Sequence, residues 1–190
     1  MSEMSDEHIL EDFILKHGEN HKKILDVGCG DGELLIELAR RNSFSELWCV
    51  DIYIEDALNN IMRAGFSQRI KCVAAKAEDI PFESRFFDFI YSIRSLHEFY
   101  NPVKALKEIR RLLTPNGEMI IIDWKKGAYT GAFERYYGKG ELRKFLEQAG
   151  IRLRNVKMKE IGRFNVLLYF GMPFLSNRQR HNTFFYLFQT

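Results

Sequence analysis

Residues 24 to 32 read Ile-Leu-Asp-Val-Gly-Cys-Gly-Asp-Gly, and this stretch decides how the chain folds. Its first four residues are apolar apart from Asp26, which is typical of a buried strand. The loop that follows carries glycine at every second position, so its backbone can turn sharply and approach a ligand closely. Residues 33–41 then place leucines at helical spacing. The stretch therefore predicts a strand, a glycine loop and a helix in succession.

The same alternation continues along the chain. Strands are predicted at 24–27, 47–50, 70–74, 87–91, 119–123, 153–160 and 165–170. Helices are predicted over the first 17 residues, closed by Gly18, and at 33–41, 55–64, 102–113 and 141–149, with a turn at 114–117. Parallel strands need crossovers, so we expect a doubly wound α/β fold with a mostly parallel seven-stranded sheet and helices on both faces. The last two strands lack a crossover helix and should form an antiparallel hairpin.

A single domain is expected to hold all 190 residues. The hydrophobic fraction of 46% and the charged fraction of 28% are those of an ordinary globular protein. Residues 1–20 are interpreted as an N-terminal helix or lid, 21–173 as the core and 174–190 as a tail. The tail packs across the sheet, forms a homodimer contact or derives from a cloning vector, and the sequence leaves these three readings open.

Composition and cysteine usage indicate a cytoplasmic protein. The N-terminus has no apolar run typical of a signal peptide, and the longest apolar stretch, 164–175, is shorter than the ~20 residues that span a bilayer. The three cysteines contain no CxxC pair and fall in or beside predicted strands, which predicts reduced thiols. The formal net charge of +2 gives no reason to expect nucleic acid as a partner.

The glycine loop lacks two common nucleotide-binding motifs. The dinucleotide fingerprint GxGxxG would need glycine where Glu33 stands, and no Gly-Lys-Ser/Thr of a P-loop follows. Ligands of open α/β sheets bind beyond the carboxyl ends of the strands, which is where this loop lies. Its pattern, acid-x-Gly-x-Gly-x-Gly directly after a strand, resembles the class I S-adenosylmethionine-dependent methyltransferases.

The resemblance covers about residues 22 to 172. Cys-Val-Asp51 ends the second strand about 20 residues after the glycine loop, where the family places its ribose-binding acid. Further similar motifs are Ala-Glu-Asp-Ile-Pro-Phe at 77–82, Phe-Asp-Phe-Ile-Tyr-Ser at 87–92, Leu-His-Glu at 96–98, the helix and turn at 105–117, and the helix at 141–150. They are similar to the small-molecule branch, and Ile-Arg at 93–94 is similar to the quinone C-methyltransferases. The resemblance implies a Rossmann-like fold with S-adenosylmethionine as cofactor.

The family's cofactor contacts transfer to the loop and to the second strand. Asp26 either holds the methionine end of the cofactor or fixes only the amides of its own loop. Asp51 either accepts the ribose hydroxyls, with Ile52 covering one face of adenine, or is a surface acid that ends a strand. The loop residues implied in cofactor binding are Gly28, Cys29, Gly30 and Gly32.

The adenine contact departs from the family pattern. Relatives often carry an acid immediately before the Ala-Glu pair, and here that position is Lys76. The contact then falls to the Ala77 backbone, to Glu78 or to Asp79, which also fits as the opening of a turn. Ser92 is expected at the boundary between cofactor and acceptor.

Candidate catalytic residues follow the fourth and fifth strands. His97 is either a general base or substrate orienter, or a structural residue at the start of a helix. Arg94 either binds an acidic group of the substrate or forms a surface ion pair. The loop from Trp124 to Gly140 either covers the acceptor, with Tyr137 as a contact, or packs on the sheet edge. Its tyrosines and phenylalanine are Tyr129, Phe133, Tyr136 and Tyr137.

The resemblance implies transfer of a methyl group to a small organic acceptor by in-line displacement, which requires alignment and no Lewis acid. The histidines offer no ligand set, so no metal is expected. Two alternatives remain: an RNA or protein methyltransferase, and a module that binds S-adenosylmethionine without turnover. The motifs of DNA methyltransferases are absent from the sequence, whereas Lys76 is the feature that favours a binding module.

Overall fold

The computed structural model describes residues 5–131 and 134–171. Its seven strands are β1 Lys23–Val27, β2 Glu46–Asp51, β3 Ile70–Ala74, β4 Phe87–Ile93, β5 Leu113–Trp124, β6 Val156–Ile161 and β7 Phe164–Phe170. Its helices are α1 Asp6–Gly18, α2 Glu33–Arg41, α3 Glu55–Arg63, α4 Pro102–Leu112 and α5 Lys139–Gln148, with short 3-10 turns η1 Leu96–Glu98 and η2 Leu153–Asn155.

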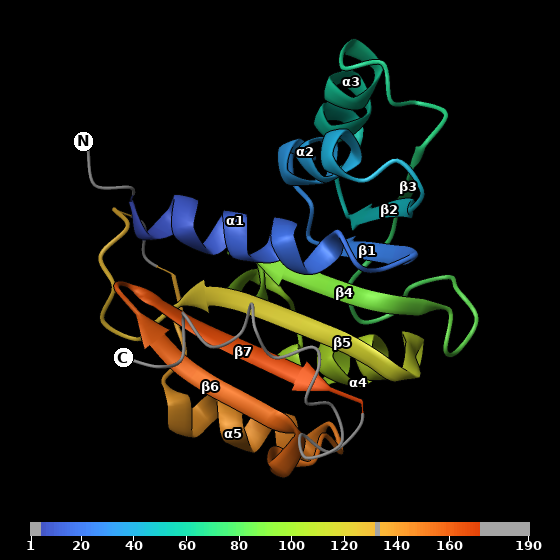
Figure 1. Ribbon diagram of the computed structural model, residues 1–190. Helices are drawn as coiled ribbons and strands as arrows, with labels where there is room; N and C mark the ends of the chain where they lie inside the picture. Colours follow the sequence, from blue (N-terminus) through green and yellow to red (C-terminus); the bar gives the residue numbers. More distant parts are fainter. Residues whose placement is uncertain (1–4, 132–133, 172–190) are drawn as a thin grey trace.

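One sheet joins all seven strands in the order β3-β2-β1-β4-β5-β7-β6 (Figure 1). Strands β1 to β5 pair in parallel, whereas β7 runs antiparallel between β5 and β6. This arrangement confirms the doubly wound α/β fold and the C-terminal antiparallel hairpin. Strand β1 lies near the middle, so the glycine loop that follows it opens between β2 and β4.

Helices cover both faces of the sheet (Figure 1). Side chains of α1, α2 and α3 form one hydrophobic cluster with one face, and side chains of α4 and α5 form a second cluster with the other. Local signals set the helix ends: the Asn101 side chain accepts a hydrogen bond from Lys104 N at 3.0 Å, and Pro102 occupies the first helical position of α4.

Helix α1 is fixed to the sheet by apolar and charged contacts. Leu10 and Ile14 are completely buried in the first cluster. At the end of the helix, His17 and His21 place Nε2 at 3.4 and 3.7 Å from the Glu118 carboxylate of β5, and all three side chains are buried. Burial lowers the pKa of His21, and the Glu118 charge opposes this effect. The predicted N-terminal helix is thus an integral part of the fold.

Three sequence predictions of local structure are wrong. Residues 114–117 are not a turn but belong to β5, which pairs with β4 at Leu113 and again from Glu118, with an irregularity in between. Strand β4 extends to Ile93, so Ser92 lies within the strand. Strand β6 begins only at Val156, because residues 153–155 form η2. Gly117 O accepts a hydrogen bond from Gly171 N at 2.9 Å, which joins this segment to the residue after β7.

The prediction of reduced thiols is wrong for two of the three cysteines. Cys49 and Cys72 are register partners on the neighbouring strands β2 and β3, with 4.6 Å between their Cα atoms, and they form a disulfide. Cys29 is free. The inference of a cytoplasmic location rested on reduced cysteines and therefore loses that support.

Two further expectations concern membrane-spanning segments and the residues near the C-terminus and in the loop after β5. None of the helices in the described ranges is long and apolar enough to cross a membrane. The predictions for Phe133 and for the tail at 174–190 concern residues outside the described part of the chain.

The disulfide predicts a reductant-sensitive stability. It closes a loop with a sequence separation of 23 residues, and cross-links of this size stabilise a fold by about 3 kcal/mol. We expect dithiothreitol to lower the free energy of unfolding by this amount in the native chain, as measured by urea titration with circular dichroism. Cys72→Ala should be insensitive to reductant, and Cys29→Ala should respond like the native chain. Three titratable thiols in the unreduced, denatured protein would contradict the pairing.

Candidate functional site

The loop after β1 follows a backbone path that requires glycine. Gly28, Gly30 and Gly32 have φ of 76°, 55° and 74°, a region that other residues rarely adopt. A Cβ on Gly28 would lie 2.5 Å from the Ser95 Cβ, whereas a Cβ on Gly30 would meet nothing within 4 Å. Gly28 thus permits close packing against the loop after β4, and Gly30 leaves an open face beside the loop.

Hydrogen bonds fasten this loop to the end of β2. Gly28 N donates to Val50 O at 2.8 Å, and Gly30 N donates to the Asp51 carboxylate at 2.9 Å. Tyr53 N donates to the same carboxylate at 3.2 Å. Gly32 has a different role, because it precedes α2 and a Cβ there would lie 3.3 Å from the Ala57 Cβ. Asp51 is therefore held beside the glycine loop, and Gly32 serves helix packing.

Asp26 is a buried carboxyl group at the base of the loop. It is 2% exposed, and its Oδ1 and the Tyr91 hydroxyl have no hydrogen-bond partner of normal geometry among the described residues. Burial raises the pKa of Asp26 to about 8; the nearby Tyr91 hydroxyl opposes this shift, and the charges of Asp51 and Asp31 add to it. Such a group is largely protonated at neutral pH unless a cation reaches it.

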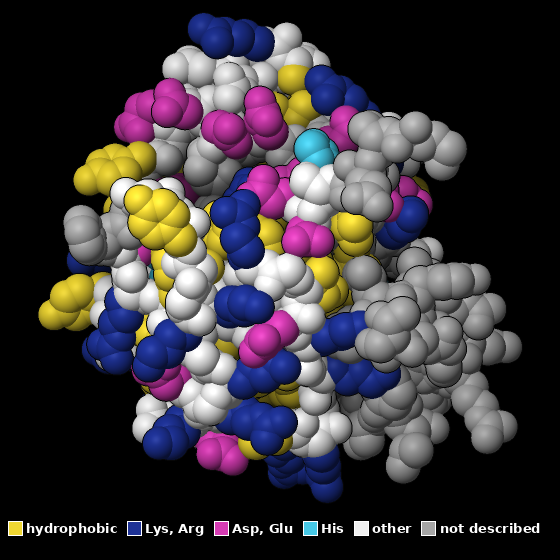
Figure 2. Space-filling view, turned by 90° about the vertical axis from the view of Figure 1, so that its left-hand side faces the viewer, with side chains coloured by type: hydrophobic (Ala, Val, Ile, Leu, Met, Phe, Trp, Pro, Cys, Tyr) yellow, Lys and Arg dark blue, Asp and Glu magenta, His cyan; other side chains and the backbone are white. Residues whose placement is uncertain are grey.

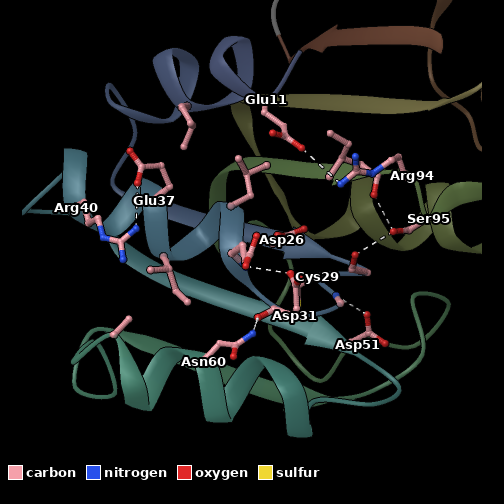
Figure 3. Close-up of a pocket in the computed structure, with 18 of the residues that line it drawn as sticks. Glu11, Asp26, Cys29, Asp31, Glu37, Arg40, Asp51, Asn60, Arg94 and Ser95 are labelled. Atoms are coloured by element: carbon pink, nitrogen blue, oxygen red, sulfur yellow. Dashed lines mark hydrogen bonds and ion pairs between the residues drawn. The ribbon is translucent and has the colours of Figure 1, made fainter. Parts of the chain in front are cut away.

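A cavity of about 860 Å³ opens at these residues (Figure 3). Gly28, Cys29 and Gly30 line it, and burial raises the pKa of the Cys29 thiol, which is therefore neutral. Seven acids and three arginines line it as well: Glu11, Asp26, Asp31, Glu33, Glu37, Asp51 and Glu98, with Arg40, Arg63 and Arg94. The lining is strongly acidic and suits a cationic ligand.

The structure places six of the expected cofactor contacts outside this cavity lining, and Gly32, which serves helix packing, is one of them. Ile52 is 56% exposed next to Asp51, and Asp79 is exposed. Ala77 is buried in the second hydrophobic cluster. Glu78 accepts a hydrogen bond from Asn101 N at 2.7 Å and so holds the start of α4.

The sixth residue is Ser92, which is completely buried within β4. Ser95 lines the cavity instead, and its hydroxyl donates to Gly28 O at 2.9 Å. The segment that the motif indicated thus borders the cavity, and the serine of that segment in the lining is Ser95. The reason is that β4 continues two residues beyond its predicted end.

A second group of polar residues lies at the ends of β4 and β5. His97 Nδ1 is 2.6 Å from Asp123 Oδ1, and both side chains are 3% exposed. A carboxylate only accepts, so Nδ1 carries the proton and Nε2 of the neutral ring is free to accept one. Nε2 lies 3.5 Å from Glu134 and 3.8 Å from Glu98.

Three carboxylates control the charge of His97. Burial lowers the pKa of His97, but the hydrogen bond and charge of Asp123, with the charges of Glu98 and Glu134, outweigh it and raise the pKa above its ordinary value. Single ligand atoms of His97, Glu98 and Glu134 lie within 4.8 Å of one another. The group is thus a protonatable histidine inside an acidic cluster.

Tyr136, rather than Tyr137, lies beside His97. The Tyr136 and His97 rings meet edge to face with centroids 5.1 Å apart, and the Tyr136 hydroxyl bonds Glu134 and Thr130. Tyr137 is buried in the second cluster against Phe145, where burial raises the pKa of its hydroxyl. Neighbouring residues in this extended segment point in opposite directions, so a shift of one position exchanges their roles.

Several site residues escaped the sequence analysis. Glu11 and Leu15 reach the cavity from α1, which only the tertiary fold brings there. Asp123 carried a signal, because an acid ends a predicted apolar strand, yet its pairing with His97 could not be read from the sequence.

Charged side chains are unevenly distributed over the face toward which β4 and β5 point. In Figure 2 the acids lie mainly in the upper half of this face, and the Lys and Arg side chains lie mainly below.

Comparison with known proteins agrees with this geometry. Residues 25–121 match the family described as methyltransferase domain. The chain is 38% identical over 102 residues to the sterol 4-C-methyltransferase strm-1 of Caenorhabditis elegans, covering 52% of this chain and 30% of that protein. It is 31% identical over 124 residues to the ubiquinone/menaquinone biosynthesis C-methyltransferase UbiE of Rickettsia prowazekii, covering 61% of this chain and 50% of that protein. The chain therefore spans half or less of the length of these relatives.

A solved structure matches over nearly the whole of both chains. It is a SAM-dependent methyltransferase from Aquifex aeolicus, with a TM-score of 0.70 and 27% identity over 87% of this chain and 88% of that chain. The family match extends over half of the sequence and contains the glycine loop, Asp51 and the segment after β4. The chain belongs to the methyltransferase domain family.

Proposed function

We propose that this protein is an S-adenosylmethionine-dependent methyltransferase that acts on a small organic acceptor. The observation that carries the proposal is the cavity in which the glycine loop, Asp26 and Asp51 meet. His97 and Asp123, which could handle an acceptor's proton, lie at the ends of the adjacent strands. The names of the relatives, a sterol and a quinone C-methyltransferase, support a small molecule as acceptor.

The residues present fit this cofactor. Asp26 Oδ1 is buried near the Tyr91 hydroxyl but has no hydrogen-bond partner of normal geometry among the described residues, and an ammonium group would supply one. Gly30 borders open space that a side chain would fill. Asp51 already accepts two backbone N–H groups, and a carboxylate offers about four acceptor sites, so two remain for ribose hydroxyls. The acidic lining also suits a ligand with net positive charge.

Each residue then has a role that its geometry supports. S-adenosylmethionine, when bound, supplies a methyl group on a sulfonium for in-line displacement. Asp51 orients the nucleoside, and Asp26 orients the amino-acid end through its ammonium group. Because alignment alone contributes much of the rate in such a reaction, these two carboxylates are expected to act mainly by positioning.

His97 is the candidate base for an acceptor that must lose a proton. Asp123 holds Nδ1, so Nε2 takes the proton and the carboxylate stabilises the charged ring. Tyr136 and Glu134 cover this nitrogen from the loop after β5. Tyr137 packs in the core, so the acceptor contact first assigned to it passes to Tyr136. No metal is needed for these steps, and we propose that none takes part.

The proposed function predicts cofactor binding and label transfer. Calorimetry should show binding of S-adenosylmethionine and S-adenosylhomocysteine, and labelled cofactor should methylate members of a metabolite panel with or without EDTA. Asp51→Ala should weaken the binding of both ligands, since two charge-assisted hydrogen bonds of about 1.5 to 3 kcal/mol each are lost. Asp56→Ala, an exposed acid of α3, is the matched control.

The outcomes separate the alternatives. Label that appears only in an RNA pool or in protein would refute the small-molecule acceptor. Cofactor binding without transfer to any of these would indicate a binding module. Turnover that is lost with EDTA and restored by magnesium would show that a metal takes part, and would point to the His97, Glu98 and Glu134 cluster.

The raised pKa of Asp26 predicts that ligand binding releases a proton. Below pH 8 the free carboxyl is mostly protonated, and an ammonium ligand stabilises the ionised form. S-adenosylhomocysteine affinity should therefore increase with pH, approaching tenfold per unit well below about pH 8, and become flat near that value. Calorimetry in buffers of different ionisation enthalpy measures the proton directly.

Asp26→Asn should remove both the proton release and this pH dependence, whereas Asp56→Asn, at an exposed acid of α3 outside the cavity, should keep them. In the free protein the native state holds a proton that the unfolded state has lost between the ordinary pKa and about 8. Stability should therefore decrease as pH rises through this window, and Asp26→Asn should abolish that decrease. A pH-independent affinity in the native protein would contradict the assignment.

The His97 and Asp123 pair predicts a change in titration as well as in rate. Asp123→Asn removes the charge that raises the His97 pKa, so NMR titration should show His97 losing its proton at lower pH than in the native protein. Turnover of an acceptor that must lose a proton should fall by about 100-fold in His97→Ala and in Asp123→Asn. S-adenosylhomocysteine affinity should be retained in both variants.

Two tyrosines give a matched comparison. Tyr136→Phe should reduce turnover, because it removes the hydroxyl that bonds Glu134 beside His97. Tyr137→Phe should leave turnover unchanged, because that ring packs against Phe145. An unshifted His97 titration in Asp123→Asn would refute the proposed control of its charge.

A further inference from the structure

Arg94 has an unusual backbone conformation at the wall of the cavity. It directly follows β4 and has φ of 56°; only one other non-glycine residue in the described ranges, Arg85, has a positive φ. Its N–H donates to Ile122 O at 2.7 Å, which fixes the peptide against β5. Outliers of this kind persist where surrounding structure holds them, and they concentrate at functional sites. Here the outlier places a guanidinium group on the cavity lining.

The charged partners of Arg94 hold it only loosely. Its guanidinium nitrogens lie 3.9 Å from Glu7 and 3.5 Å from Glu11, both on α1. Figure 3 shows the pair with Glu11. These distances exceed those of normal N–H···O bonds, and the side chain is 39% exposed. A guanidinium presents a planar fork of donors that matches a carboxylate in two parallel hydrogen bonds. The fork of Arg94 is thus in place and not satisfied by its present partners.

A ligand that carries a carboxylate needs a cationic side chain to bind it in this cavity. Seven acids line it, and they would repel a ligand carboxylate unless a cation received it. Arg40 is hydrogen-bonded to Glu37 at 3.2 Å and lies on the opposite side of Asp26 from Arg94 in Figure 3. Arg94 is next to Ser95, whose hydroxyl bonds the Gly28 carbonyl of the glycine loop. Arg94 is therefore joined to the glycine loop through its neighbour Ser95.

We propose that Arg94 binds the carboxylate of the cofactor's amino-acid end, and that Glu11 occupies its guanidinium in the free protein. This inference rests on the proposed function. The amino-acid end carries an ammonium and a carboxylate, and the cavity offers one group for each: Asp26 for the ammonium and Arg94 for the carboxylate. Binding then replaces a long ion pair across to α1 with a bidentate one, so α1 is released from Arg94 when the ligand enters.

The test compares two ligands that differ only at this end. S-adenosylhomocysteine has the amino-acid group, whereas 5′-methylthioadenosine keeps the nucleoside and the thioether and lacks it. Calorimetry should show that Arg94→Gln weakens the binding of S-adenosylhomocysteine by about tenfold or more and leaves the affinity for 5′-methylthioadenosine unchanged. Glu11→Gln should tighten S-adenosylhomocysteine a few-fold, because a competing carboxylate is removed. Arg143→Gln, at an exposed arginine of α5 outside the cavity, should change neither affinity.

Each contrary result has a separate meaning. An equal loss of affinity for both ligands in Arg94→Gln would overturn the proposal, since the arginine would then only shape the pocket. Unchanged affinity for both ligands would also overturn it, since the arginine would then only form a surface ion pair. Weaker S-adenosylhomocysteine binding in Glu11→Gln would overturn the exchange with Glu11. Failure of the native chain to bind either ligand would instead refute the proposed function together with this inference. Thermal unfolding of each variant confirms that the fold is retained.

Discussion

The hydrogen bond from the Gly30 amide to the Asp51 carboxylate fixes the ends of two neighbouring strands relative to each other. With the bond from Gly28 N to Val50 O, it holds the glycine loop against β2 and leaves one face of the loop open. Every other feature of the cavity is arranged around this point. The Asp26 carboxyl lies at its base, Ser95 packs on its other side from β4, and α1 contributes Glu11 above it.

The sequence was sufficient for those features that local pattern controls. The three glycines, the acid after β2 and the capped start of α4 are each contained within a few residues. Features that depend on pairing or packing were missed. Cys49 and Cys72 become partners through the register of β2 and β3, and the end of β4 placed Ser95 rather than Ser92 at the cavity. Glu11 reaches the cavity lining, and Asp123 reaches His97, only because α1 and the strand ends come together in the fold.

The electrostatics of the site follow from where the fold removes charges from water. Burial raises the pKa of Asp26, so this carboxyl is largely protonated at neutral pH, whereas the pKa of His97 is raised because carboxylates surround it. The surface continues this division: residues 125–163 contain eleven Lys and Arg and only four Glu, in contrast to the acidic lining of the cavity. Such a division orients an approaching charged ligand before contact is made.

The central position of β1 also has a consequence for the order of folding. Its partner on one side, β4, lies far along the chain, and the bond from Lys23 N to Asp88 joins residues 65 positions apart. Closing so long a loop is entropically unfavourable and makes such contacts late to form. During synthesis the glycine loop therefore stays without its second wall until β4 has emerged and paired. A ligand that recognises the finished cavity should accordingly slow unfolding and have little influence on the first steps of folding.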